Sequence, residues 1–309
     1  MKNAAASIKA RLLNHARTNG QPLNPLLENY AMGRLFWRLS ESPYSNDFVL
    51  KGAQLFAIWA NAPHRPTRDA DFLCFRPNDI AGLERIFREI CDIPSTPEDG
   101  LEWDEISVNA IREDKLHGGI RVRITALLGK ARIPVQVDVG FGDSIVPDPQ
   151  ESHWVGLLDF PSARLLVYPP ETVVAEKLQA AITLGFANSL MKDFYDLYWL
   201  SKNVEFDASV LRRAIEATFK QRNTAIPSEP PPALTAQFSS SSEKKVQWTG
   251  FLRQSYLEPL EFDEVIAELA RFLVPVIVNG NERRIWKPTA GWAHRCEIDR
   301  SKQTGLRNC

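Results

Sequence analysis

Apolar residues recur at helical spacing near the start of the chain and throughout its second half. Over residues 4–40 the pattern predicts a helical N-terminal segment, and five later stretches share the period of about 3.6 residues. Pro169 and Pro170 stand just ahead of the first of these, where a helix tolerates proline. The later helices are predicted at 169–186, 189–202, 208–221, 243–254 and 262–275.

Between these helical regions apolar and polar residues alternate, as is typical of strands. Gly52 separates the first strand from a short helix that runs to Trp59, and Asn78 or Asp79 is placed to cap a second helix. This order predicts an α/β (α+β) fold, with a mixed sheet in the first half and a helical C-terminal domain. The predicted strands are 48–50, 67–75, 119–129 and 133–141.

The chain is expected to divide into parts of different composition. Residues 222–245, rich in proline and serine, are interpreted as a linker or long surface loop. The last 30 residues lose periodicity and carry seven Lys/Arg against three Asp/Glu, which predicts a basic, poorly ordered tail. The expected parts are N-terminal helices at 1–45, a mixed-sheet domain at 46–168, a helical domain at 169–275 and the tail at 276–309.

Composition narrows the class of protein only modestly. The chain has 309 residues, 44% hydrophobic, and a formal net charge of -1, so no global basic charge indicates nucleic acid. Its four cysteines are scattered and resemble reduced thiols, not a disulfide framework or a zinc site. The N-terminus lacks an apolar signal region and no stretch is long enough to span a membrane, so a cytoplasmic protein is expected.

Acidic residues on the predicted strands suggest a metal site. Asp69 and Asp71 are two residues apart and point to the same side of their strand, where like charges repel unless a cation joins them. Mg²⁺ favours one or two carboxylates with water and phosphate. Asp138, within a β-branched run, would complete a three-acid cluster if its strand were central and adjacent. A solvated strand end and an exposed edge strand are the alternative interpretations.

Three further features suggest phosphate chemistry. A small-residue turn at Gly52 allows close backbone approach, and Arg65 and Arg68 could bind phosphate or neutralise the aspartates. On helical wheels, Lys177 and Asp193 fall within the apolar arcs of their helices. They form either a core salt bridge or a pair that points into a cleft and acts on substrate.

Taken in order, these segments resemble a known family. "FVLKGAQLFAIW", "RPTRDADFL", "VQVDVGFGD", "ETVVAEKLQA" and "MKDFYDLYWL" are similar to the AbiEii/AbiGii toxin family, within the DNA polymerase β-like nucleotidyltransferase superfamily. The resemblance covers roughly residues 5–275. The family's turn usually reads Gly-Gly or Gly-Ser, whereas this chain has Gly52-Ala53 and so lacks one hydroxyl donor.

The resemblance implies a nucleotidyltransferase domain at 46–168 and Mg²⁺-dependent transfer of NMP from an NTP, with two ions and the tRNA 3′ end as a plausible acceptor. It also implies a cognate antitoxin of the winged-helix regulator type. Two alternatives stay open: a non-catalytic protein that binds nucleotide, RNA or a partner, and a metal-dependent nuclease. The implied catalytic residues are Asp69, Asp71, Lys177 and Asp193; the nucleotide-binding residues are Lys51, Gly52, Ala53, Arg65, Thr67, Arg68 and Lys177; the metal ligands are Asp69, Asp71 and Asp138.

Overall fold

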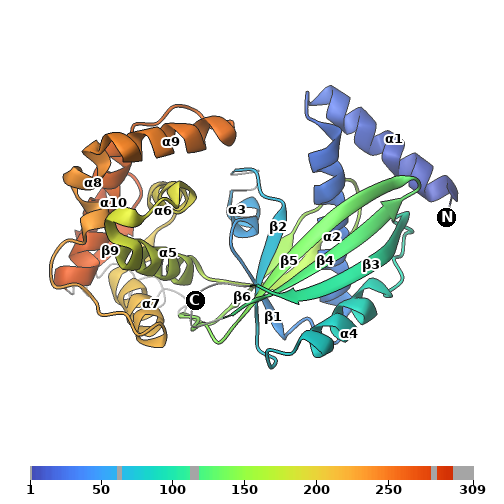
Figure 1. Cartoon of the computed structure of the whole chain (residues 1–309), viewed down its shortest axis with the longest axis horizontal. Coiled ribbons are helices and arrows are strands. Elements are labelled where there is room, and N and C mark those ends of the chain that lie inside the picture. The colour runs from blue at the N-terminus through green and yellow to red at the C-terminus, as the bar shows by residue number, and fades with distance from the viewer. Residues whose placement is uncertain (1, 61–64, 112–117, 280–283, 295–309) are drawn as a thin grey trace, which may run out of the picture. The chain divides into compact units, whose positions relative to one another are not determined.

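The chain folds into two compact units, each with its own core. The computed structural model describes residues 2–60, 65–111, 118–279 and 284–294 (Figure 1). Unit 1 comprises Met1–Asp143 and Asp148–Pro169, and unit 2 comprises Ser144–Pro147 and Pro170–Cys309. The four domain limits expected from the sequence stay a prediction.

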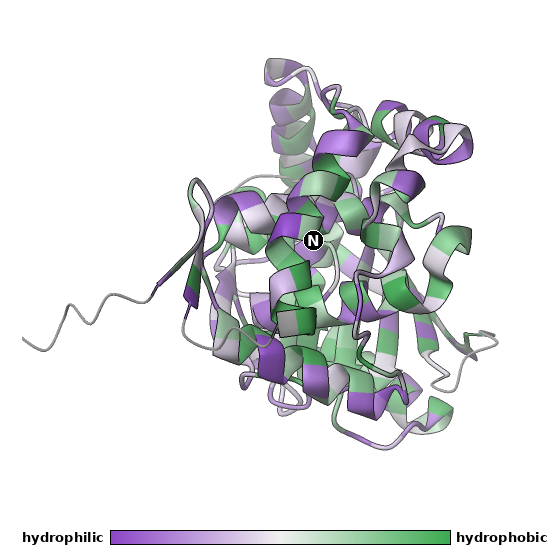
Figure 2. Ribbon diagram, turned by 90° about the vertical axis from the view of Figure 1, so that its left-hand side faces the viewer, coloured by the Kyte–Doolittle hydropathy of each residue, from purple (hydrophilic) through white to green (hydrophobic). Residues whose placement is uncertain are grey.

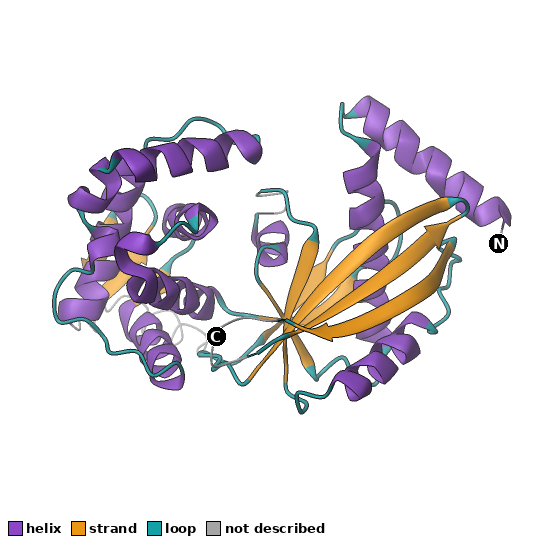
Figure 3. Ribbon diagram, in the orientation of Figure 1, coloured by secondary structure: helices purple, strands orange, loops and turns teal. Residues whose placement is uncertain are grey.

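Unit 1 is a mixed sheet with helices, as the strand and helix patterns predict (Figure 3). The alternation that predicted the strands at 119–129 and 133–141 corresponds to β4 and β5, and Asp79 caps α4 by accepting hydrogen bonds from the backbone of Ala81 and Gly82. Three further strands, β3, β6 and β7, were not predicted. The elements are α1 Lys2–Thr18, α2 Leu23–Glu41, β1 Phe48–Lys51, α3 Gln54–Trp59, β2 Asp69–Cys74, α4 Ile80–Cys91, β3 Leu101–Ala110, β4 Ile120–Leu128, β5 Ala131–Phe141, β6 Gln150–Trp154 and β7 Ala163–Val167.

The seven strands lie in the order β3-β4-β5-β2-β1-β7-β6. Strand β2 is parallel to β5 on one side and antiparallel to β1 on the other, so it lies at the centre of the sheet. Strand β5 is also internal, between β2 and β4. Both acid-bearing strands are therefore central, which confirms the central, adjacent position on which the three-acid prediction depended and excludes an edge strand for Asp138.

Helices α2 and α4 pack on one face of this sheet; in the view of Figure 1, α2 passes behind the strands and α4 lies below β3. Their apolar residues meet the buried members of each strand, such as Phe72 on β2 and Val137 on β5. Hydrophobic and hydrophilic residues share the same helices in Figure 2, as expected of amphipathic helices on a sheet. The alternation along β4 and β5 leaves the polar members of both strands on the opposite face.

Unit 2 is mainly helical, which confirms the predicted class of the second half. An aromatic cluster that includes Phe194, Phe238, Phe262 and Trp248 forms part of its core. Its elements are α5 Pro170–Leu184, η1 Gly185–Ala187, α6 Met191–Asn203, β8 Phe206–Asp207, α7 Ala208–Gln221, η2 Pro232–Leu234, α8 Ala236–Ser240, α9 Ser242–Gln254, α10 Phe262–Asn279, β9 Arg284–Lys287 and β10 Gly291–His294.

Two segments that the sequence analysis left irregular carry regular structure. Within 222–245, the short helix α8 is capped by Thr235 and buries Phe238 completely, so this segment is not simply a surface linker. Beyond residue 275, α10 continues to Asn279 and β9 pairs with β10, where Trp286 is fully buried and its indole N–H donates to Ser201 O. These apolar anchors stabilise both segments; residues 295–309 of the expected tail lie outside the described residues.

Two of the four cysteines lie in the described part of the chain, and both are buried free thiols, Cys74 and Cys91. Burial raises the pKa of both thiols, that of Cys91 to about 12. Cys296 and Cys309 lie outside the described residues. Among the helices that the structure describes, none is both long enough and apolar enough to cross a membrane.

Candidate active site

A row of charged residues crosses four neighbouring strands of unit 1. In the register of the sheet, Lys51 on β1 is opposite Asp71 on β2, Asp71 is opposite Asp138 on β5, and Asp138 is opposite Arg121 on β4. Residues directly opposite one another on adjacent strands share a face, with their Cβ atoms about 5 Å apart. The row therefore places two carboxylates side by side at the centre of the sheet, with one cation on each flank.

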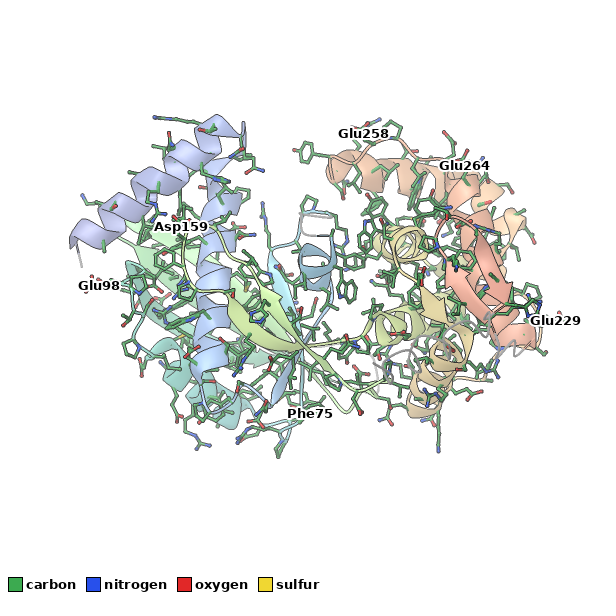
Figure 4. All side chains as sticks on the ribbon, turned by 180° about the vertical axis from the view of Figure 1, so that it is seen from behind. Phe75, Glu98, Asp159, Glu229, Glu258 and Glu264 are labelled. Atoms are coloured by element: carbon green, nitrogen blue, oxygen red, sulfur yellow. The ribbon has the colours of Figure 1, made fainter. Side chains whose placement is uncertain are left out.

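Asp69 and Asp71 lie on the face of β2 opposite Ala70 and Phe72, as the strand period predicted. Both are half-buried, whereas Ala70 and Phe72 between and after them are buried. Beyond the strand the chain turns outward at Phe75, which is 57% exposed and labelled in Figure 4. The two acids thus occupy the start of β2 and Phe75 follows its end.

The turn after β1 lies directly against Asp71. Gly52 has φ +72°, a conformation that favours glycine, and a Cβ added there would lie 2.1 Å from Asp71 Oδ2. Glycine is therefore required for two reasons: the left-handed backbone and the close approach of a carboxylate. Ala53 follows as the residue before α3, and its side chain makes no capping hydrogen bond.

Asp138 is held by Arg121 through two hydrogen bonds. The Nε of Arg121 donates to Oδ1 at 2.7 Å and a terminal nitrogen donates to Oδ2 at 2.6 Å. The hydrogen bonds to Asp138 raise the pKa of Arg121, and the charges of Asp138, Asp69 and Asp71 add to this effect. Arg121 therefore lies in the field of all three carboxylates and pairs with one.

Lys51, at the other end of the row, pairs with a fourth carboxylate. Its Nζ is 2.8 Å from Asp143 Oδ2, and it lies 5.2 Å from the centre of the Tyr168 ring. The side chains of Lys51 and Asp143 are 18% and 12% exposed, so the pair is only partly accessible to water. Asp143 ends the "VQVDVGFGD" segment, and only its place in the fold brings it to β1.

Arg65, Thr67 and Arg68, which precede β2, differ in exposure and in the groups that they contact. Arg65 is half-buried, and the hydroxyl of Thr67 donates to the backbone oxygen of Asp69 at 3.3 Å. The Arg68 side chain is 78% exposed and its Nε lies 3.5 Å from Glu28 on α2. Arg68 immediately precedes β2, and its guanidinium is directed toward α2.

The carboxylates of this row supply some of the oxygen ligands that a divalent cation needs. Among the described residues, no group of three or more His, Cys, Asp and Glu side chains is arranged to hold a metal ion, and joint metal binding by Asp69, Asp71 and Asp138 stays a prediction. In this structure the Arg121 guanidinium donates to both oxygens of Asp138. Asp69 and Asp71 still supply a pair of carboxylates on one face, and Mg²⁺ commonly binds to one or two carboxylates with water and phosphate.

A second charged cluster lies in unit 2, where α5 meets α6. Lys177 Nζ lies 2.5 Å from Asp193 Oδ1 and 2.9 Å from Asp196 Oδ2. Asp196 is fully buried, and the side chains of Lys177 and Asp193 are 13% and 14% exposed. The structure thus contains the salt bridge that the wheels allowed, with a second carboxylate on the same lysine. Roles of Lys177 and Asp193 toward substrate stay a prediction.

Three residues of these clusters were missed from the sequence. Arg121 lies in the alternating run that predicted β4, and the outward-facing position of this arginine was the available signal. Asp196 fell at the margin of the apolar face of its helix, a weaker form of the signal that identified Asp193. Asp143 had no local signal, because its partner Lys51 is 92 residues away along the chain.

The AbiEii family model, described as "Nucleotidyl transferase AbiEii toxin, Type IV TA system", matches residues 34–268. Among solved structures, JHP933 from Helicobacter pylori is similar with a TM-score of 0.48 and 17% identity, over 83% of this chain and 92% of its own. A "putative nucleotidyltransferase" from H. pylori is similar with a TM-score of 0.47 and 17% identity, over 82% and 95%.

Comparison with curated proteins finds no match. The family match nevertheless spans well over half of the chain and includes both β2 with its acids and the α5–α6 cluster. The chain is a nucleotidyltransferase and belongs to the AbiEii toxin family of type IV toxin–antitoxin systems.

Proposed function

We propose that this protein transfers a nucleoside monophosphate from an NTP to an acceptor in a Mg²⁺-dependent reaction, and that the acceptor is the 3′ end of tRNA. The observation that carries the proposal is the position of Asp71. It lies between a glycine turn at β1 and the carboxylate of Asp138 on β5, with Asp69 on the same face. Membership of a nucleotidyltransferase family supports the reaction class.

The proposed role of the carboxylates is to bind the metal ions and to fix their position. Asp69 and Asp71 would hold Mg²⁺, with Asp138 as a third ligand once Arg121 releases it. When bound, the metal ions neutralise charge that develops on the phosphoryl group and orient it. Asp71 is fixed by Gly52 on one side, so its oxygens need little reorganisation on binding.

Residues around the β1 turn would bind the nucleotide. The backbone at Gly52 and Ala53 has no side chain that blocks an approaching phosphate, and Lys51 carries a cation one residue before. We assign nucleotide contacts to these three residues and to Arg65, Thr67 and Arg68, which precede β2. The salt bridge between Arg68 and the half-buried Glu28 would have to open for this role.

Lys177 and Asp193 are proposed to act in the transfer as well, Lys177 as a cation for the triphosphate and Asp193 as the residue that holds it. Their contact supports this assignment, and so does their place within the matched region of the family model. The partner that belongs to a type IV system is an antitoxin, here proposed to be a winged-helix regulator, in the cytoplasm.

The test is a transfer assay with each labelled NTP, Mg²⁺ and total tRNA, comparing wild type with Asp71→Asn. Loss of one metal-binding carboxylate is expected to reduce label transfer by at least about 1,000-fold, because a Mg²⁺ ligand is removed from the reacting centre. Thermal unfolding should stay within a few degrees of wild type, since Asp71 is half-buried and not part of the apolar core.

The control is Asp104→Asn on β3. Asp104 is, like Asp71, a carboxylate on a strand of this sheet, but it lies on the edge strand β3 and pairs with Arg132 at 3.4 Å. The Asp104→Asn variant should transfer label at about the wild-type rate. No transfer by wild type with any NTP would favour a non-catalytic binding protein, and RNA shortened without NTP would favour a nuclease.

A further inference from the structure

Arg121 and Asp138 form a fork-to-fork ion pair on the open face of two central strands. Both guanidinium–carboxylate contacts are short, at 2.7 and 2.6 Å, and the two residues are directly opposite in the antiparallel register of β4 and β5. Their side chains are 31% and 18% exposed. A bidentate pair of this kind is stronger than a single hydrogen bond at the same exposure, because the guanidinium donates to both carboxylate oxygens in a fixed geometry.

The pair also lies next to a like charge. Asp71 is directly opposite Asp138 on the other side, so β5 presents one carboxylate between a second carboxylate and a guanidinium. Without Arg121, the two acids would repel each other in the absence of a cation. Arg121 therefore supplies, from the sheet itself, the positive charge that a divalent ion would otherwise supply.

We propose that Arg121 is an internal counter-ion that keeps Asp138 from binding metal, so that a divalent cation gains this third carboxylate only by displacing the guanidinium. The inference rests on the proposed function, because it assumes that Asp69 and Asp71 bind the metal. It gives Arg121 a positioning role: the residue sets the metal concentration at which the three acids act together, and it holds Asp138 in place until then.

A cross-strand pair with a purely structural role makes a different prediction. It would stabilise the sheet by a modest amount and leave metal affinity unchanged except through the loss of one nearby positive charge. Arg123 provides the measure of that general effect. It is two residues further along the same strand and on the same face, where it is opposite Gln136, which carries no charge.

The experiment measures Mn²⁺ binding to the full chain by the decrease in the electron paramagnetic resonance signal of free Mn²⁺, without nucleotide. Arg121→Gln should bind Mn²⁺ about fivefold more tightly than wild type, the affinity equivalent of a partly exposed ion pair. Arg121→Lys, which keeps the charge but loses the fork, should fall between the two. Arg123→Gln should change the affinity less than twofold.

A second comparison tests whether Asp138 is the metal ligand that Arg121 blocks. In an Asp138→Asn background, the change Arg121→Gln should tighten binding no more than Arg123→Gln does, because the carboxylate that Arg121 withheld is gone. Circular dichroism and thermal unfolding in EDTA would check that each variant is folded. We expect each one to fold, because the Arg121–Asp138 pair is partly exposed and lies outside the apolar core.

The outcomes separate the two proposals. Equal Mn²⁺ affinity in Arg121→Gln and Arg123→Gln, with wild type binding through Asp71 as shown by its loss in Asp71→Asn, would overturn the role of Arg121 and leave the metal site standing. A gain in Arg121→Gln that persists with Asp138→Asn would also overturn it. Absence of Mn²⁺ binding in wild type and every variant would overturn the metal site itself and this inference with it.

Discussion

Gly52 shows how a single residue fixes the position of a carboxylate. Its φ is +72°, and a Cβ at this position would lie only 2.1 Å from Asp71 Oδ2, so there is no room for a side chain. Gly52→Ala should therefore displace Asp71 as well as strain the turn. We expect transfer activity to fall about 100-fold, since displacements near 1 Å have effects of that size, and stability to fall by about 1–2 kcal/mol.

Gly129→Ala is the matched control for this change. Gly129 also has a positive φ, +61°, but an added Cβ there meets nothing within 4 Å. Its variant should lose a similar amount of stability, measured by urea unfolding, and keep near-wild-type transfer. If Gly52→Ala were as active as Gly129→Ala, the contact between the turn and Asp71 would have no part in catalysis.

Local pattern could predict which face each acid occupies, but not its neighbours. The period of two along β5 placed Asp138 opposite the buried valines, and the sheet bears this out. Its register with Asp71, and with Arg121, depends on pairings between strands that the local sequence does not specify. The metal cluster of three acids stays a prediction, and the arginine that pairs with the third acid was not predicted.

At the scale of elements, a salt-bridge cluster connects α5 to α6: Lys177 on α5 lies between Asp193 and Asp196 on α6. Lys177→Met would remove the cation that Asp193 shares with the fully buried Asp196. We expect the free energy of unfolding of unit 2 to fall by about 3 kcal/mol, since removal of one member of a buried ion pair is strongly destabilising. Urea unfolding followed by circular dichroism measures the change.

The companion variant Lys177→Met/Asp196→Asn separates a structural lysine from a catalytic one. Removal of the buried charge should restore part of the lost stability, while transfer should stay low if Lys177 acts on the nucleotide. Recovery of transfer together with stability would show that Lys177 is only a structural cation. Asp193 remains in this variant, so any residual effect of its charge is retained.

The long helices, and the short β1 and α3 on either side of Gly52, could be predicted from sequence, whereas the short α8 and β9 could not. Helices such as α6 and α10 show enough turns for the apolar face to be recognised. The five-residue α8 lies in a proline- and serine-rich segment, and β9 has only four residues. Both are stabilised by one large buried side chain each, Phe238 and Trp286, and this tertiary contact outweighs local composition.

The whole molecule contains two cores, and a buried ion network belongs to the first. Asp99, which is 3% exposed, accepts hydrogen bonds from Arg38 at 2.6 Å and Arg34 at 3.0 Å, both on α2. Phe272, in α10, and Leu211, in α7, belong to the core of unit 2. Because each unit has its own core, we expect the chain to unfold in two transitions.

Acid should affect these transitions unequally. Burial raises the pKa of Asp99, but hydrogen bonds from Arg38 and Arg34 and the Arg38 charge outweigh it, so the pKa lies below its ordinary value of 3.8. A carboxyl whose pKa is lower in the folded state contributes stability fully above the unfolded pKa, and that contribution is lost as pH falls through the folded pKa. Scanning calorimetry from about pH 7 down to about pH 2 should therefore show the unit 1 transition keep the stability that depends on Asp99 until the pH falls below about 4, and lose it progressively from there.

Two substitutions assign the transitions and complete the test. Asp99→Asn should lower one transition by about 3–5 kcal/mol of stability at neutral pH, because two buried guanidinium groups lose their counter-charge, and it should remove the Asp99-dependent part of the acid sensitivity of that transition. Leu211→Ala, a cavity in the core of unit 2, should lower only the other transition, by about 2–5 kcal/mol. A single transition that both substitutions shift would show that the two cores unfold as one.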